Sequence, residues 1–527
     1  MILYQGRGLT FFFDEWTWIL ERRNPSVDAF LQPHVGHMSA LPVAFYELFL
    51  HVFGLTHYVA FRSLVLVLHL GCIALVFVFV RRRLPASVAL VPVVALLLLG
   101  SAWQDLLWPF QIGFVLSVLG GVGALLLVES DTPRADRGAM ACVVVALASS
   151  SVGLPIVGGL ALQLVLERQW HRIRIVAIPL FLYVVWYVFY GESVVTAQGV
   201  VPFGRFGIEA AGAAVGALTG AGDVGGQWLL LVLGPFVAVS IIRAAPERRT
   251  RLIALAAIPA AYWTSLALGR SGFQPADASR YLYPGAVFVV LLLAECLRGV
   301  RIGPVVLGMV VLAGAWSVVW NVQEFETGRE LMLPFTRDGR VEMGAMEVGI
   351  HGVESAYTAV RPPVRKGVAD YVAAFDDLGF PAARVPEIRR DGPELRRKAD
   401  AYLIAVAGIA LDQPSSPSGP APVVTLRGPA IADGVSCIVL TAGSAPVDVE
   451  VAPRTSMLRI DALGTSAVDL RLRNFGDTYS TFDAPLVTVA PGTARDLPVP
   501  KVTAGPWRVG VRTATSARVC GARLPSR

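Results

Sequence analysis

The chain has 527 residues, of which 54% are hydrophobic and 16% carry charge, and its formal net charge is +6. A soluble globular protein usually has about 25% charged residues, and the deficit here is concentrated in the first 320 residues. The composition therefore excludes a single soluble domain and predicts a membrane domain followed by a soluble region. The positive balance does not indicate nucleic acid as a partner, because the arginines of the apolar part lie mostly in short loops between apolar runs.

An aromatic cluster near the N-terminus contains two adjacent acids, Asp14 and Glu15. We interpret Asp14 as a general base that takes the proton of a sugar hydroxyl, and Glu15 as a partner that orients the substrate or binds a cation. The flanking phenylalanines and tryptophans predict a position at the membrane surface. Alternatively, the two acids only cap the N-terminus of an interfacial helix.

Two histidines follow, in the pattern His34-x-x-His37. We interpret them as substrate contacts or as elements of the loop architecture. The alternative is a metal site shared with Asp14 or Glu15, although two histidines in a glycine-containing loop are weak evidence for a metal. The next segment, 38–55, is apolar but holds a proline, a glutamate and a histidine, so we predict an amphipathic helix on the outer membrane surface.

Ten apolar runs are long enough to cross a bilayer, or nearly so. The fourth and fifth are short, so they form a hairpin through the serines 149–151, or one of them is re-entrant. The runs cover residues 57–80, 84–100, 110–128, 139–149, 152–166, 174–190, 227–242, 252–268, 281–297 and 304–320.

Arginines mark every alternate loop between these runs, beginning with Arg81–Arg83 after the first. The positive-inside rule assigns those loops to the cytoplasm, and the other loops and both chain ends to the outside. An external segment 1–56 without a preceding span is unusual, so we expect a first transmembrane helix to precede it; the alternative is that the first run translocates this segment. The glycine-rich stretch 198–226 is interpreted as a flexible external loop that dips toward the membrane.

Polar residues in the outer loops are candidates for substrate contact. Gln104, Asp105 and Gln111 lie among tryptophans in the second outer loop, a composition typical of sugar-binding surfaces. The alternative is an aromatic belt with a helix cap.

Two arginines break the topological pattern, because outer loops are otherwise poor in arginine, and a third is an ionisable group inside a predicted span. Arg270 and Arg280 bracket the loop 269–280, and Arg62 lies shortly after the start of the first run. A guanidinium there suits a lipid phosphate, which it binds in a bidentate manner. The alternative is that these side chains reach phospholipid headgroups.

The composition changes after residue 320. Residues 321–411 are charged, with helical character around 366–379 and 393–411, and residues 412–422 form a Pro/Ser linker. Short alternating strands separated by turns predict a β-sandwich over 423–527. We expect this exported region to carry a disulfide between Cys437 and Cys520; the alternative is two buried thiols.

The topology and the position of Asp14-Glu15 resemble the GT-C superfamily of membrane glycosyltransferases. The resemblance covers residues 1–320 by layout, with 57–320 as the transmembrane core. Within the superfamily, the chain is most similar to the actinobacterial arabinofuranosyl- and mannosyltransferases that use decaprenyl-phosphate sugars. Several of these end in a carbohydrate-binding β-sandwich, which 423–527 resembles in type. The resemblance implies that Asp14 is the base and that Arg280 holds the donor phosphate.

The sequence therefore predicts a mostly α polytopic membrane protein, with about ten transmembrane helices and an exported β-sandwich, that acts as a glycosyltransferase. Its partners would be a polyprenyl-phosphate sugar donor, an envelope glycan acceptor and the lipid bilayer, with a divalent cation as the one conceivable cofactor. One rival is a transporter or flippase, although the halves show no duplication of the kind found in transporters. The other rival is a non-catalytic glycan-binding scaffold in the membrane.

Overall fold

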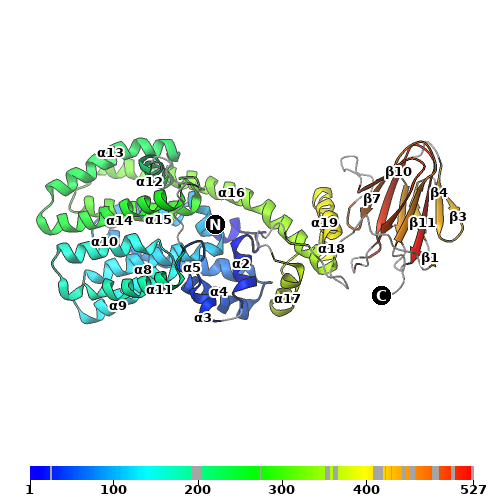
Figure 1. The fold of residues 1–527 in the computed structure, drawn as a ribbon. Coiled ribbons are helices and arrows are strands. Elements are labelled where there is room, and N and C mark those ends of the chain that lie inside the picture. Colours follow the sequence, from blue (N-terminus) through cyan, green and yellow to red (C-terminus); the bar gives the residue numbers. More distant parts are fainter. Residues whose placement is uncertain are drawn as a thin grey trace. The chain divides into compact units, whose positions relative to one another are not determined.

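The structure is a computed structural model of the chain, and it separates into two compact units (Figure 1). The first comprises Met1–Leu9 and Glu21–Leu333, and the second comprises Thr10–Leu20 and Pro334–Arg527. The structure describes all residues except 24–25, 193–202, 273, 350–356, 360–365, 408–418, 422, 429, 442–446, 452–456, 477–485, 500–501, 503–504 and 524–527.

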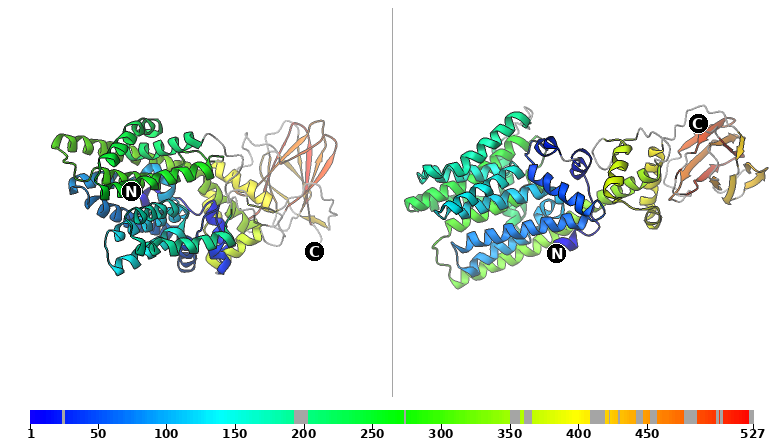
Figure 2. Two further views of the ribbon diagram at one scale, coloured as in Figure 1. Left: turned by 60° about the vertical axis from the view of Figure 1, so that its left-hand side comes forward. Right: turned by 90° about the horizontal axis from the view of Figure 1, so that it is seen from below.

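The described part of the first unit is helical throughout (Figure 2). The long helix α16 (Pro304–Gly349) begins in this unit and ends in the second. The other helices are α1 (Ile2–Gln5), α3 (Val27–Leu31), α4 (Ala40–Phe53), α5 (Tyr58–Arg81), α6 (Ala86–Leu97), η1 (Gly100–Ala102), α7 (Trp103–Leu107), η2 (Pro109–Gln111), α8 (Ile112–Val128), α9 (Pro133–Ser149), α10 (Gly153–Leu166), η3 (Trp170–Arg172), α11 (Arg174–Tyr190), α12 (Phe203–Thr219), α13 (Gly222–Arg243), α14 (Pro246–Arg270) and α15 (Ser279–Cys296).

Eight helical segments among the described residues are long and apolar enough to cross a membrane. They coincide with eight of the ten runs predicted from the sequence. The other two runs are α9 and α10, with 17 and 14 residues; at 1.5 Å per residue they reach about 25 Å and about 21 Å, short of the hydrocarbon core. The chain is therefore a mostly α polytopic membrane protein, as predicted.

Helix α12 corrects one expectation, because it lies within the stretch 198–226 that was predicted to be a flexible loop. It packs on α13, α14 and α15 and buries its alanines. A Cβ added to Gly216 would lie 2.1 Å from the carbonyl oxygen of Gly222, and one added to Gly226 would lie 1.9 Å from that of Gly212. The glycines therefore allow two helices to approach closely, as small residues do between membrane helices.

The loops that the arginine pattern assigns to the cytoplasm gather at one end of the first unit. Arg83 donates hydrogen bonds to Glu129 at 2.6 Å and to Glu295 at 2.5 Å. Arg248 donates to the backbone carbonyl oxygens of Glu295 and Cys296 at 2.8 Å. The ends of the first, third, seventh and ninth predicted runs thus meet on one side of the bundle, which agrees with their alternation along the chain.

The second unit combines helices with a β-sandwich. Its helices, besides the end of α16, are α2 (Asp14–Glu21), α17 (Val368–Leu378), α18 (Val385–Arg390) and α19 (Pro393–Val406). Its strands are β1 (Gly419–Ala421), β2 (Val423–Arg427), β3 (Ala430–Asp433), β4 (Cys437–Leu440), β5 (Val447–Val451), β6 (Met457–Ala462), β7 (Val468–Arg473), β8 (Val487–Val489), β9 (Ala494–Pro498), β10 (Arg508–Thr513) and β11 (Ala517–Arg523).

The strands form two antiparallel sheets, and the predicted sandwich is confirmed. One sheet has the order β3-β4-β11-β6-β9, with β1 also paired to β11, and the other has the order β2-β5-β10-β7-β8. The inward-facing valines of β5 (Val447, Val449 and Val451) are buried, in keeping with a strand that faces a core on one side. Residues of α16, α18 and α19 share this hydrophobic core. The predicted linker 412–422 falls mostly outside the described residues.

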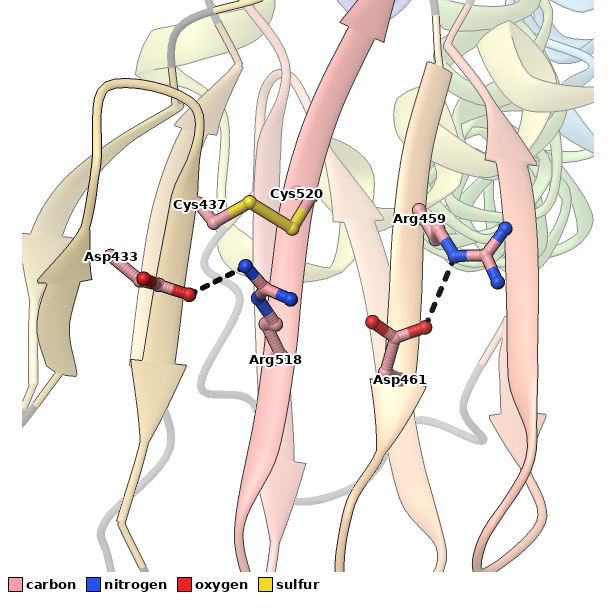
Figure 3. The surroundings of a disulfide bond; sticks show 6 residues. All are labelled: Asp433, Cys437, Arg459, Asp461, Arg518 and Cys520. Atoms are coloured by element: carbon pink, nitrogen blue, oxygen red, sulfur yellow. Dashed lines mark hydrogen bonds and ion pairs between the residues drawn. A yellow bond between two sulfur atoms is a disulfide. The ribbon is translucent and has the colours of Figure 1, made fainter. Parts of the chain in front are cut away.

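A disulfide joins Cys437 in β4 to Cys520 in β11 (Figure 3). The two residues lie directly opposite each other in the antiparallel register, with Cα atoms 4.1 Å apart. Nearby, Arg518 forms an ion pair with Asp433 at 2.7 Å across the same sheet. The cross-link therefore ties neighbouring strands from segments that are 83 residues apart in sequence.

A buried carboxylate connects α19 to the sandwich. Asp400 accepts hydrogen bonds from the backbone amides of Asn474, Phe475 and Gly476 at 2.6, 2.9 and 2.8 Å. Its side chain is fully buried. Because three amides converge on one anionic group, this contact fixes the helix against the end of β7.

Candidate functional site

The His34-x-x-His37 pattern forms a strained two-residue turn. The two histidines exchange both backbone hydrogen bonds, each with an N···O distance of 3.0 Å. The central residues Val35 and Gly36 have φ angles of 49° and 77°, as a type I′ turn requires. Positive φ is easy for glycine but is an outlier for a β-branched residue such as valine. The turn is held in place by Arg270, whose Nη2 donates to the carbonyl oxygen of Val35 at 3.0 Å.

His37 makes hydrogen bonds through both of its ring nitrogens. Nη2 of Arg270 lies 2.7 Å from Nε2 of His37, and because a guanidinium only donates, Nε2 must be the acceptor. The ring proton therefore lies on Nδ1, which donates to Oγ of Ser151. Both nitrogens are thus occupied, so His37 does not offer a metal ligand in this arrangement.

The protonation state of His37 follows from its surroundings. Withdrawal from water and the neighbouring charges of Arg270, His34 and Arg280 lower the pKa of His37 to about 3. The imidazole is therefore neutral at physiological pH, which agrees with its role as an acceptor for Arg270. The pKa of His34 is lowered to about 4 by burial and by the charge of Arg22.

Arg280 is tied to the second outer loop at the start of α15. The side-chain oxygen Oε1 of Gln104 accepts a hydrogen bond from the backbone amide of Arg280 at 3.2 Å. The backbone amide of Gln104 donates to Oγ of Ser279 at 3.1 Å. The guanidinium itself donates from Nη2 to Gln274 at 3.1 Å. Within the described part of the chain, Nε of Arg280 is buried without a hydrogen-bond partner, and no carboxylate forms an ion pair with this arginine.

Asp105 lies in the same region, next to Gln104 on α7. Its side chain is fully buried, and neither carboxylate oxygen has a hydrogen-bond partner among the described residues. The electrostatic field of Arg280 reaches it. A buried polar group without a partner is costly, so a ligand that donated a hydrogen bond here would stabilise the site.

Two other candidates have no described hydrogen bond to either arginine. Arg62 donates from Nη2 to the carbonyl oxygen of Leu3 at 2.8 Å, and its guanidinium packs so closely on Gly6 that a Cβ there would lie 2.4 Å from Nη1. This cation therefore holds the N-terminal segment, and no described contact joins it to Arg270 or Arg280. Gln111 is buried at the end of η2, likewise without a described contact to either arginine.

Asp14 and Glu15 belong to the second unit, where α2 begins. Oε2 of Glu15 accepts a hydrogen bond from the backbone amide of Phe12 at 2.9 Å, and this carboxylate is fully buried. The capping alternative therefore describes Glu15, in the manner of a capping box. Asp14 is half-buried and follows Phe13, a non-glycine residue with a positive φ of 52°. Such strain clusters at functional sites.

Three of the aromatic residues around this pair are buried within the second unit, and their position at a membrane surface stays a prediction. Phe11, Trp16 and Trp18 are at most 3% exposed. The ring of Trp16 packs on Tyr371 and Phe375 of α17, with centroids 5.3 and 6.3 Å apart.

Sequence reasoning missed the serines of this site. Ser151 and Ser279 make the contacts that join its loops, but only the run of serines at 149–151 gave a signal, and that run was interpreted as a turn. A serine in a turn is common for local reasons, so its long-range partner is visible only in the fold.

Comparison with known proteins leaves the family open. No family model matches the chain, and no curated protein matches it. Among solved structures, the chain is similar to ArnT from Cupriavidus metallidurans bound to undecaprenyl phosphate, with 12% sequence identity, a TM-score of 0.46, and coverage of 71% of this chain and 82% of that chain. A likeness of this degree carries no argument, so the function has to be argued from the residues.

Proposed function

We propose that this protein is an integral membrane glycosyltransferase that moves a sugar from a polyprenyl-phosphate donor to an extracytoplasmic envelope glycan or glycolipid. The observation that carries the proposal is the hydrogen bond between Arg270 and the neutral His37, with Arg280 near enough for its charge to act on both groups. All three lie in segments that the arginine pattern assigns to the outer side.

Two guanidinium groups in a half-buried site repel each other unless an anion lies between them. A phosphate fits this need, because arginine binds it with two parallel hydrogen bonds. The unpartnered Nε of Arg280 offers one such donor. A polyprenyl phosphate would place its headgroup at this depth, since both arginines lie at the ends of candidate membrane spans.

Each of the remaining candidate residues has its own role in the proposed sugar transfer. The acceptor hydroxyl oxygen attacks the anomeric carbon, its proton passes to the Asp14 carboxylate, and the sugar–phosphate bond breaks with its electron pair on the phosphate. Arg270 and Arg280 stabilise the phosphate as its charge grows. Gln104 and Asp105 offer an amide and a carboxylate to sugar hydroxyls, and Glu15 holds the backbone that carries Asp14.

We further propose that the C-terminal domain lies outside the cell, where a disulfide persists, and that it binds glycan. Phe475 and Trp507 are the aromatic residues described in the sandwich, and both are buried. Glycan contact through the described surface would therefore use polar side chains rather than stacking on exposed rings.

Binding of decaprenyl phosphate to the purified full-length protein in nanodiscs tests the proposal. Arg270→Ala and Arg280→Ala should each weaken binding by at least about tenfold, since a hydrogen bond to a charged group contributes about 1.5–3 kcal/mol. Arg301→Ala is the matched control, because it removes an exposed arginine from a loop assigned to the cytoplasm. Unchanged binding by both outer-side variants would overturn the proposed function. Transport of the lipid across the bilayer without sugar transfer would favour a flippase instead.

A further inference from the structure

The turn between α9 and α10 reaches the arginine site through two serine side chains that face Nδ1 of His37. Oγ of Ser151 accepts the Nδ1 proton of His37, and Oγ of Ser150 lies farther from the same nitrogen, at 3.5 Å. Ser149, two positions earlier, bonds instead to Val145 of its own helix at 2.7 Å. Three segments distant in sequence thus meet in the order Ser151, His37, Arg270.

We propose that Ser151 and His37 are positioning residues that hold the Arg270 guanidinium in its ligand-binding orientation. Arg270 can only donate, so it selects the tautomer in which Nδ1 carries the proton. The Ser151 hydroxyl accepts that proton and holds the ring with Nε2 directed at Arg270. The inference rests on the proposed function, in which Arg270 contacts the donor phosphate.

The geometry explains why such a device is useful. An arginine side chain has several rotatable bonds, and ordering it on ligand binding costs conformational entropy. Here Nη2 is already directed by two acceptors, Val35 O at 3.0 Å and His37 Nε2 at 2.7 Å. The Arg270 guanidinium is therefore oriented before the anion binds.

The charge state of His37 suits this role. A protonated imidazole has donors on both nitrogens and would repel the guanidinium. The pKa of about 3 keeps the ring neutral, so the acceptor persists throughout the physiological range. A serine hydroxyl is the appropriate partner on the other side, because it can accept the Nδ1 proton.

Substitution of His37 separates positioning from simple packing. The side-chain oxygen of glutamine can take the place of Nε2 and accept from Arg270, whereas asparagine is too short to reach that position. We expect His37→Gln to bind decaprenyl phosphate within about threefold of the wild type. His37→Asn should bind about tenfold or more weakly, which is the loss expected when a charged hydrogen bond of about 1.5–3 kcal/mol is removed.

The serine arm uses the double variant Ser150→Ala/Ser151→Ala, which removes both hydroxyls near Nδ1, with Ser149→Ala as the matched control. The double variant should weaken binding and the control should not. ¹⁵N NMR of histidine-labelled protein provides a readout that does not depend on the ligand: the wild type should show His37 protonated at Nδ1.

The outcomes distinguish the two proposals. If Arg270→Ala weakens binding but the glutamine and asparagine variants bind alike, or if NMR places the proton on Nε2, positioning is overturned and the proposed function stands. If Arg270→Ala binds as the wild type does, the proposed function of this arginine fails first. Equal loss in both His37 variants, with a lowered melting temperature in each, would assign His37 to packing alone and also overturn the inference.

Discussion

A single nitrogen of Arg270, Nη2, donates to Nε2 of His37 at 2.7 Å. The same atom donates to the carbonyl oxygen of Val35 at 3.0 Å, inside the strained turn. The end of α14 is therefore coupled to the loop that precedes α4, although 233 positions separate Arg270 from His37. This coupling brings an arginine and a neutral histidine into the same site.

Asp14→Asn should reduce sugar transfer by about 10²–10⁴, the usual cost of losing general-base catalysis. The substitution keeps the shape of the side chain but leaves no carboxylate to accept the proton. Binding of the polyprenyl-phosphate donor should survive, because other residues hold the phosphate. The two readouts are the transfer rate and the donor affinity, measured separately, and a wild-type rate would reduce Asp14 to a helix-capping residue.

Cysteine labelling in intact cells tests the topology. Pro275→Cys, in the loop between Arg270 and Arg280, should react with an impermeant maleimide. Glu247→Cys, in the arginine-rich loop before α14, should react only after the cells are opened. Both positions are exposed, so a difference in labelling reports the side of the membrane. The reverse pattern would place the arginine site in the cytoplasm and contradict the topology.

Acid should destabilise the folded protein through its two turn histidines. His37 and His34 have pKa values of about 3 and about 4 in the fold, against 6.5 for an ordinary histidine. Between these values the unfolded chain binds protons that the folded chain does not, so this contribution to stability is complete above pH 6.5 and is lost as the pH falls. The melting temperature in detergent should therefore fall less steeply with acid for His37→Gln than for the wild type. His57→Gln, at an exposed position, should leave the slope unchanged, and identical slopes in all three proteins would speak against this assignment.

Asp400→Asn should destabilise the second unit. The amide retains one acceptor oxygen but replaces the other with a donor, so the three backbone amides of Asn474, Phe475 and Gly476 are no longer all satisfied. We expect a loss of about 1.5–3 kcal/mol, the range for a hydrogen bond to a charged group. Thermal unfolding monitored by circular dichroism measures it. Glu394→Gln on the same helix, at an exposed site, is the control, and equal stability of both variants would refute the prediction.

The disulfide should be present in protein isolated from the native membrane. Non-reducing mass spectrometry should detect the peptide pair that contains Cys437 and Cys520. Cys437→Ser should lower the stability of the sandwich by about 2–5 kcal/mol. Free thiols at both positions would contradict the prediction, and they would also weaken the case for an exported domain.

Much of the fold could be predicted because its signals are local. Runs of apolar residues predicted the spans, and alternation of valines in β5 predicted a half-buried strand. Helix α12 could not be predicted in this way, since glycine and alanine are ambiguous until a partner helix is known. Gly216 and Gly226 favour a loop by composition, but in the fold they let α12 and α13 approach closely.

By itself, the sequence determined the membrane spans and the sandwich, because hydropathy and period act over short stretches of chain. It identified Arg270, Arg280, His37 and Gln104 as separate candidates. It did not show that Arg270 contacts His37 or that Gln104 contacts Arg280. Only the tertiary structure decided that Arg62 holds the N-terminal segment and that Ser151 supports His37. Hydrogen bonds between segments more than a hundred residues apart depend on which helices become neighbours, and that is decided by packing over the whole bundle.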